Sequence, residues 1–137
     1  AGQDAVDRYY RAQAQWRALA HEAGAAFVPA ATPGFNDKGV RGGHEATSRK
    51  LDSDAEYGSL FRAMLEQAVA HTDDATGNML LITSWNEWHE DTQIEPIVEA
   101  PPTAVDDSES GKAFSEGLSY EGYGERYLEI LRAAVAP

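Results

Sequence analysis

Helix-like and strand-like segments alternate along this sequence, and this order constrains the fold more than any single motif. Apolar residues recur at helical spacing over residues 3–23 and again over 55–72. A short apolar run follows each of them, at 26–31 and at 79–83, and a last helical pattern covers 122–135. Runs that are apolar on both faces are typical of parallel strands covered by helices. The sequence therefore predicts an α/β fold with two parallel strands and flanking helices.

Capping residues and loops set the expected limits of these elements. Gly24 follows the first helical pattern as a C-cap, and Asp54 precedes the second as an N-cap. The connection 35–54 is polar and glycine-rich, and its length indicates a functional or disordered loop. Residues 97–119, which include a proline pair and an acidic, serine-rich tract, are predicted to form a long exposed acidic loop.

The number of strands limits what the chain can be on its own. Two strands cannot close a (β/α)8 barrel, which needs about 250 residues. We therefore expect residues 1–137 to form a single unit. This unit would be the C-terminal part of a TIM-type barrel enzyme, or of one that assembles with a missing N-terminal part. The alternative is a small three-layer α/β domain complete in itself, although two parallel strands alone make a poor core.

The charge balance excludes some partners. There are 23 acidic residues against 11 basic ones, giving a net charge of -12, and such a surface repels nucleic acid and anionic membranes. The scarcity of lysine suggests adaptation to high salt, although ordinary acidic proteins can share this composition. Cysteine is absent, so disulfides and thiolate metal sites are excluded.

No membrane segment is expected. No stretch is continuously apolar over the roughly 20 residues that a transmembrane helix needs. The first residues, AGQDAVDRYY, have neither the basic start nor the apolar run of a signal peptide. We expect a soluble chain, and the sequence leaves its compartment open between extracellular and cytoplasmic.

The second apolar run ends in the sequence WNEWHEDTQIEP at residues 85–96, where carboxylates, amides and indoles crowd together. Hydrolysis of a glycosidic bond needs one carboxylic acid to protonate the leaving oxygen and a second carboxylate to act as nucleophile or base. Glu87 and Glu90 lie three residues apart where a strand bends into a turn, and we expect them to face one cleft as this pair. Two carboxylates that share a site resist double ionisation, so one of them can stay protonated as the acid.

The neighbours of this pair suit a sugar site. Trp85 and Trp88 offer flat apolar platforms for sugar rings, and Asn86 can hydrogen-bond a sugar hydroxyl. Glu95 and His89 are expected in supporting roles. A single Glu or Trp at such a place is usually structural. It is their combination directly after an apolar strand that favours a functional interpretation.

A second group of polar side chains follows the first predicted strand. Asn36, Asp37 and Arg41 lie just past its end, where loops of parallel strands gather, and they are candidates for binding substrate. A solvated loop with an internal ion pair is an equally good interpretation of these residues.

A metal or phosphate site is a weaker hypothesis for the same region. The sequence offers two histidines and three acids as ligands, but no histidine pair has the i, i+4 spacing of a zinc helix; the residues are His44, Glu45, His89, Glu90 and Asp91. The glycine-rich stretch 39–43 does not join a strand directly to a helix, as a phosphate loop does. We therefore expect no metal and no cofactor.

The motif at 85–96 resembles the signature of glycoside hydrolase family 99 and family-99-like domains, an N-E-W-x-E-G-T-x-I-E-P pattern. Residues 33–37 with Arg41 look like a strand-end loop of that family, and residues 123–131 look like its terminal helix. The resemblance implies a (β/α)8 barrel and endo-acting, retaining cleavage of α-mannosidic linkages. Where the family usually has glycine after the second glutamate, this chain has Asp91, which tolerates a positive φ less easily than glycine.

The resemblance also implies a role for each carboxylate. Glu87 matches the residue that deprotonates the 2-hydroxyl of the sugar, which then attacks the anomeric carbon to give a 1,2-anhydro sugar. Glu90 matches the residue that protonates the departing oxygen and later activates water. The alternative is a non-catalytic carbohydrate-binding or polysaccharide-assembly module of the same fold. We expect the isolated chain to have little activity, because other parts of the cleft would be missing.

Overall fold

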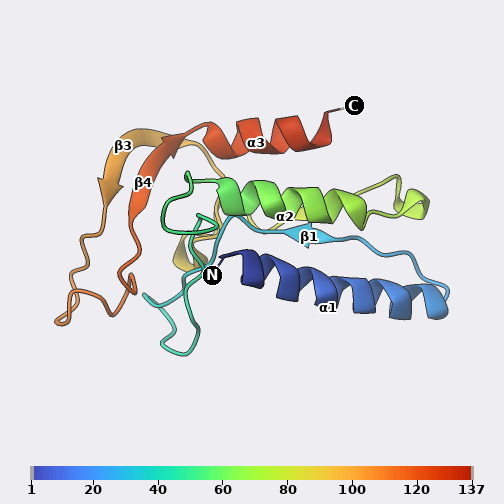
Figure 1. Cartoon of the computed structure of the whole chain (residues 1–137), viewed down its shortest axis with the longest axis horizontal. Coiled ribbons are helices and arrows are strands. Elements are labelled where there is room, and N and C mark those ends of the chain that lie inside the picture. The colour runs from blue at the N-terminus through green and yellow to red at the C-terminus, as the bar shows by residue number, and fades with distance from the viewer. Residues whose placement is uncertain (1, 137) are drawn as a thin grey trace.

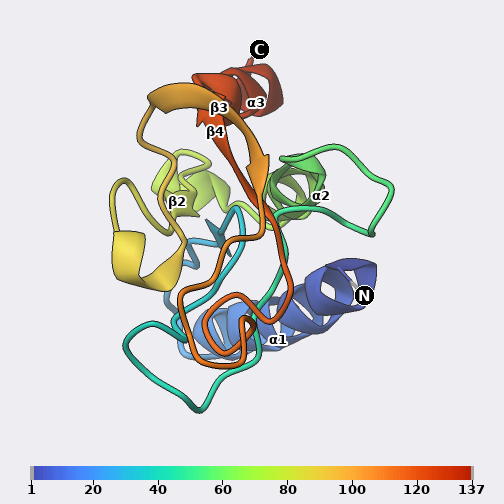
Figure 2. The same cartoon turned by 90° about the vertical axis from the view of Figure 1, so that its left-hand side faces the viewer.

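Three roughly parallel helices form one layer of the molecule, a first small sheet packs against it, and a hairpin of two further strands lies at one end of the layer (Figure 1). The structure is a computed structural model and describes residues 2–136. Helix α2 (Ser59–Ala70) packs between α1 (Gly2–Glu22) and α3 (Arg126–Val135), as the view turned by 90° also shows (Figure 2). No helix within residues 2–136 is long and apolar enough to cross a membrane.

The first sheet consists of two short parallel strands, β1 (Ala30–Ala31) and β2 (Leu81–Ile82). Their register pairs Ala30 with Leu81, and backbone hydrogen bonds of 2.9 Å extend the pairing on either side. Helix α2 connects the two strands, so the predicted order of strand, helix and parallel strand is confirmed. Both strands are shorter than the apolar runs that predicted them.

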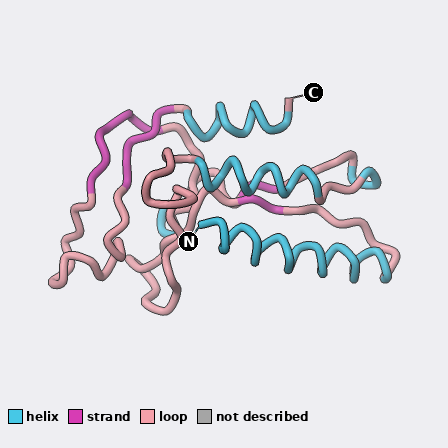
Figure 3. The backbone as a smooth tube through the Cα atoms, viewed as in Figure 1, coloured by secondary structure: helices cyan, strands magenta, loops and turns pink. Residues whose placement is uncertain are grey.

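Both strands lead into loops at the same end of the helix layer, near the N-terminus (Figure 3). The other edge of β1 is covered by α1. The side-chain amide of Gln13 accepts from the backbone N–H of Ala30 and donates to its carbonyl oxygen, both at 2.9 Å, so a buried side chain takes the place of a further strand. The loops after β1 and β2 are therefore held next to each other.

The hydrophobic core lies between the three helices and the first sheet. Its buried members come from all three helices, from β1 and β4 and from the segment after β2; they are Val6, Tyr10, Ala31, Leu60, Phe61, Met64, Leu65, Ala68, Ile94, Tyr123, Tyr127 and Ile130. Five residues of the stripe predicted for the second helical pattern are buried, Leu60, Phe61, Met64, Leu65 and Ala68, whereas its first residue, Tyr57, is only partly buried and precedes α2. Trp16 and Leu19 of the first helical pattern are exposed. Leu81 of β2 is 54% exposed, so one face of the first sheet is open.

The predicted N-cap of α2 is wrong. Asp54 lies in a turn, and α2 begins only at Ser59, after Gly58 with φ 88°. The carboxylate of Asp52 accepts from the backbone N–H groups of Asp54 and Ala55, which closes this turn before the helix starts. The φ of 88° favours glycine at position 58, and a Cβ there would lie 2.5 Å from the end of the Ile130 side chain of α3, which would have to shift.

The predicted loop over residues 97–119 and the predicted start of the last helix at residue 122 are also wrong. Ile97–Thr103 forms strand β3, which pairs antiparallel with β4 (Tyr120–Gly124). The prolines at 101 and 102 fit because the register shifts between Ala100 and Thr103, where the ladder loses its regular hydrogen bonds. The loop is therefore limited to residues 104–119, and α3 begins at Arg126.

Candidate active site

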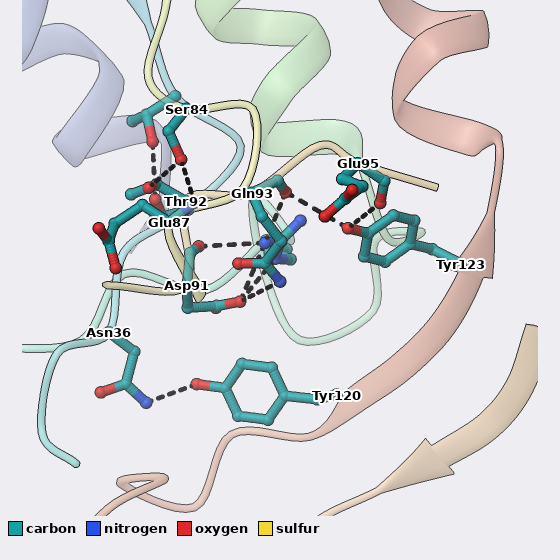
Figure 4. A network of polar contacts seen from close by, with 12 residues as sticks. Asn36, Ser84, Glu87, Asp91, Thr92, Gln93, Glu95, Tyr120 and Tyr123 are labelled. Carbon is teal, nitrogen blue, oxygen red and sulfur yellow. Dashed lines mark hydrogen bonds and ion pairs between the residues drawn. The ribbon is translucent and has the colours of Figure 1, made fainter. Parts of the chain in front are cut away.

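The loop after β2 is closed on itself by its own polar groups (Figure 4). The hydroxyls of Ser84 and Thr92 lie 2.8 Å apart, and the N–H of Ser84 donates to the carbonyl of Thr92 at 2.7 Å. The N–H of Ile94 returns to the carbonyl of Ser84 at 3.2 Å. We call residues 84–95 the catalytic-motif turn. Its ends are held together, so the residues between them project from the end of β2.

A single turn of 3-10 helix, η2 (Trp88–Glu90), occupies the middle of the catalytic-motif turn. Glu87 is its N-cap, and its carboxylate accepts from the N–H of His89 at 3.1 Å. Glu90 is the last residue of η2, so Glu87 and Glu90 stand at the two ends of one short turn.

Glu87 is the more exposed carboxylate of the two, with 47% of its side chain accessible. Its backbone N–H donates to the hydroxyl of Ser84 at 2.9 Å, and the imidazole of His89 lies 3.4 Å from its carboxylate. In Figure 4 its side chain points away from Glu95 and Tyr123. The backbone of Glu87 is thus anchored by Ser84, and its carboxylate contacts His89 through Oε1 while remaining about half exposed.

Glu90 is less exposed, at 27%, and forms an ion pair with Arg41. This hydrogen bond raises the pKa of Arg41 above its ordinary value, and the charges of Asp37 and Glu87 add to the shift. Arg41 therefore lies within electrostatic range of both carboxylates of the motif. The backbone carbonyl of Glu90 also accepts from the N–H of Asn36 at 2.8 Å, which ties the two strand-end loops together.

The three candidates after β1 take different positions. The side-chain amide of Asn36 donates to the hydroxyl of Tyr120 at 2.6 Å and to the carbonyl of Phe114 at 2.8 Å (Figure 4). Asp37 is buried, and its carboxylate lies 3.3 Å from Nε of Arg41. Only Arg41, with a side chain that is 53% exposed, faces solvent beside a motif carboxylate. The interpretation as an internal ion pair is confirmed for Asp37 and Arg41.

The indoles of the motif are both about half exposed, as a sugar platform would require. Trp88 donates from Nε1 to the carboxylate of Glu95 at 3.3 Å, and the backbone carbonyl of Glu95 accepts from the hydroxyl of Tyr123 at 2.8 Å. Glu95 thus supports an indole of the motif. Asn86 and His89 are exposed.

The residues proposed above as metal ligands do not converge. Nδ1 of His44 lies 2.8 Å from Asp37, on the loop after β1, whereas Asp91 binds a different partner. Within residues 2–136 no group of three or more His, Cys, Asp or Glu side chains is arranged to hold a metal ion.

Arg49 is the main residue of this region that sequence reasoning missed. Its side chain is 5% exposed, and it donates from Nε and Nη2 to the carboxylate of Asp91 at 3.1 and 2.9 Å. Burial is the largest influence and lowers the pKa of Arg49, but Asp91 and Tyr127 together outweigh it, so this pKa is raised. Asp91 itself has φ 50°, the left-handed conformation that its place after the second glutamate suggested. The sequence offers no signal for Arg49, because an arginine in a polar loop is normally solvated.

A cavity of about 170 Å³ lies against the catalytic-motif turn. Its lining combines aromatic rings of the hairpin and α3 with polar groups of the turn, and includes Arg49, Trp88, Asp91, Tyr120, Tyr123 and Tyr127. Glu87 and Glu90 do not line it. The carboxylate pair instead lies at a surface that this chain leaves open.

Comparisons with known proteins place the chain in a family. Residues 7–109, well over half of its length, match the family model of Glycosyl hydrolase family 99. A Glycoprotein endo-alpha-1,2-mannosidase-like protein of Danio rerio is 38% identical over 72 residues, which are 53% of this chain and 14% of that protein. The chain thus spans about a seventh of that relative.

Solved structures agree in fold. A glycoside hydrolase-like protein superposes with a TM-score of 0.60 over 92% of this chain and 29% of that one, at 22% identity. The family 99 endo-alpha-mannosidase from Bacteriodes thetaiotaomicron, in complex with BIS-TRIS-Propane, superposes with a TM-score of 0.51 over 94% of this chain and 33% of that one, at 25% identity. Residues 7–109, which the family model matches, include the loops after β1 and β2 and both Glu87 and Glu90. The chain therefore belongs to glycosyl hydrolase family 99.

Proposed function

We propose that this chain supplies the catalytic carboxylates of a glycoside hydrolase that cleaves α-mannosidic linkages within a glycan, with retention. The observation that carries the proposal is the presentation of Glu87 and Glu90 one 3-10 turn apart at the end of β2. Arg41 comes from the neighbouring strand end and lies near both carboxylates. Such convergence of strand-end loops is where barrel enzymes build their active sites.

In this proposal Glu87 is the base. Its carboxylate removes the proton of the 2-hydroxyl, and the resulting oxygen attacks the anomeric carbon to give a 1,2-anhydro sugar. The backbone N–H of Glu87 donates to the hydroxyl of Ser84 and its Oε1 accepts from the N–H of His89, while about half of the side chain stays exposed for substrate. Glu90 is the acid, which donates a proton to the departing oxygen and later activates the water that opens the anhydro ring.

The other motif residues would shape the sugar site. Trp85 and Trp88 stack on sugar rings, and Asn86 hydrogen-bonds a hydroxyl. Glu95 keeps the indole of Trp88 in place through its 3.3 Å hydrogen bond. Arg41 binds a substrate hydroxyl once the substrate loosens its pairing with Glu90.

We further propose that the chain works as the C-terminal part of a (β/α)8 barrel. The first sheet has only two strands, and Met79 and Leu81 are half exposed beside it. Further strands and helices of the barrel would cover these residues and complete the cleft. The isolated chain should therefore hydrolyse little, because the remaining subsites come from elsewhere.

The test uses the full-length protein that contains this chain, with an α-mannan as substrate. We expect release of new reducing ends, and a first product whose anomeric configuration by NMR is that of the substrate. Glu90→Gln and Glu87→Gln should each abolish turnover while the variants still bind the glycan. Glu66→Gln, at an exposed position of α2, is the matched control and should keep full activity.

A non-catalytic carbohydrate-binding or assembly module is the second candidate. The observation that favours it is the ion pair between Glu90 and Arg41, which occupies the side chain that the catalytic proposal needs as its acid. In that case the full-length protein would bind the glycan through its exposed indoles but release no reducing ends. The same experiment therefore decides between the two functions.

A further inference from the structure

Arg49 lies behind the catalytic-motif turn and holds more than one part of it. Besides the carboxylate of Asp91, its Nη2 donates to the backbone carbonyl of Asp91 at 3.1 Å and to that of Gln93 at 3.0 Å. One guanidinium therefore fixes both the side chain and the backbone of the residue that follows Glu90. The planar fork of arginine suits such multiple bonding, which the point charge of lysine cannot reproduce.

The guanidinium of Arg49 is itself held by two aromatic rings. Its central carbon lies 4.7 Å from the ring centroid of Tyr127 and 5.3 Å from that of Tyr123. These two rings contact each other edge to face, with centroids 4.6 Å apart. Tyr123 also donates its hydroxyl to the carbonyl of Glu95. The arginine thus connects the catalytic-motif turn to β4 and α3.

The backbone around Asp91 has little freedom to adjust. Asp91 is the C-cap of η2, with φ 50°, and its N–H donates back to the carbonyl of Trp88. Non-glycine residues adopt this conformation only where their surroundings hold them. Because Glu90 is the preceding residue, a rotation at Asp91 would re-aim its carboxylate.

We infer that Arg49, acting through Asp91, is a positioning residue that sets the orientation of Glu90 relative to Glu87. The inference rests on the proposed function for its catalytic consequence. A buried ion pair is by itself a weak source of net stability, so its benefit lies in the geometry that it imposes. Displacing a catalytic group by about 1 Å can cost roughly 100-fold in rate.

The decisive comparison is between Arg49→Met and the double variant Arg49→Met with Asp91→Gly, made in the full-length enzyme. Arg49→Met should lower kcat roughly 10- to 100-fold. Its KM should stay within about threefold of the wild-type value, because the sugar-binding surface is unchanged. The double variant should recover folding stability, since no unpaired carboxylate is buried, but not kcat. Arg49→Lys should give only partial rescue of kcat.

A control separates this effect from the loss of any arginine. Arg62 lies on α2, is half exposed and pairs with the exposed Glu56. Arg62→Met should leave both kcat and KM at wild-type values. The inference would be overturned by wild-type kcat in Arg49→Met, or by a double variant that recovers kcat together with stability, which would indicate a purely structural pair.

Hydrogen exchange tests the same inference without any activity. The amides of Ser84, Ile94 and Glu95 are hydrogen-bonded within the catalytic-motif turn and should exchange faster in the double variant and in Arg49→Lys, while amides of α2 keep their wild-type rates. Unchanged exchange at these three amides would refute the positioning role. If the wild-type enzyme hydrolyses no glycan, the proposed function fails, and this measurement still decides the positioning role. If Arg49→Met does not fold, the other two variants carry both tests.

Discussion

Two arginines from the same connection reach adjacent residues of the catalytic-motif turn, and they do so in opposite environments. Arg49 is buried, binds Asp91 and lies over the rings of Tyr123 and Tyr127. Arg41 is more than half exposed and pairs with Glu90 and with the buried Asp37. The buried arginine therefore faces the backbone of the turn, and the exposed one faces the carboxylate expected to act in chemistry.

The contrast distinguishes a residue that positions the site from a residue that contacts the substrate or the reacting groups. A charge in a low-dielectric environment is fixed by its partner, because losing that partner leaves an ion without solvent. An exposed ion pair is weaker and can be exchanged for water or substrate. We therefore expect substitutions of Arg49 to change stability and geometry, and substitutions of Arg41 to leave stability almost unchanged.

The largest effect is expected for Arg49→Met. The substitution keeps an unbranched side chain but removes the guanidinium, which leaves the carboxylate of Asp91 without a counter-ion in a buried position. The free energy of unfolding should fall by about 3–5 kcal/mol. Urea denaturation followed by tryptophan fluorescence measures this loss. A change close to that of Arg62→Met would show that the burial of Arg49 has no energetic consequence.

Asp91→Gly should cost less, about 1–3 kcal/mol. Arg49 keeps the backbone carbonyls of Asp91 and Gln93 as acceptors, so its charge is not left without partners. Glycine also adopts φ 50° without strain, which offsets part of the loss. The same urea experiment ranks the two variants. If Asp91→Gly were the more destabilising, the carboxylate and not the arginine would be the main anchor of the turn.

The difference between the two arginines could not be predicted from the sequence. Both lie in one polar connection, and nothing local distinguishes them. Arg49 is buried only because Asp91, Tyr123 and Tyr127, which are distant in sequence, surround it. The proximity of Arg41 to Glu90, in contrast, follows from a simple rule: the ends of parallel strands meet at one edge of the sheet, so their loops meet as well.

The fold shows the same difference between features that local sequence signals predict and features that depend on distant residues. The helices, the parallel pair and the carboxylate turn could be predicted because apolar periodicity and a polar strand end are local signals. The hairpin of β3 and β4 could not, because Pro101, Pro102 and Gly122 normally argue against a strand. Here Gly122 is required by contact: a Cβ at this position would lie 2.1 Å from the carbonyl oxygen of Val98 on the opposite strand.

The aromatic surroundings of Arg49 predict sensitivity to alkaline pH. Burial raises the pKa of Tyr123 from 10.0 to about 12, although Arg49 opposes the shift, and burial likewise raises that of Tyr120 to about 12. Between pH 10.0 and about 12 these tyrosines lose their protons in the unfolded chain but keep them in the folded chain. Stability should therefore be unaffected below about pH 10 and fall as the pH rises toward about 12. Tyrosinate absorbance that rises together with the loss of fluorescence signal would verify this coupling, whereas free titration in a folded chain would contradict it.

The smallest change in the free energy of unfolding is expected for Arg41→Met, and its dependence on salt concentration distinguishes it from the change in Arg49→Met. The pairs of Arg41 are partly in solvent, so any difference in stability from the wild type should be a small fraction of that for Arg49→Met. This difference should shrink further between about 0.1 and 1 M NaCl, because mobile ions screen exposed charges. The loss in Arg49→Met should persist over the same range, since ions do not reach a buried pair. Equal salt dependence in both variants would show that the two arginines share one environment. The distinction between Arg49 as a buried positioning residue and Arg41 as an exposed residue beside Glu90 would then be wrong.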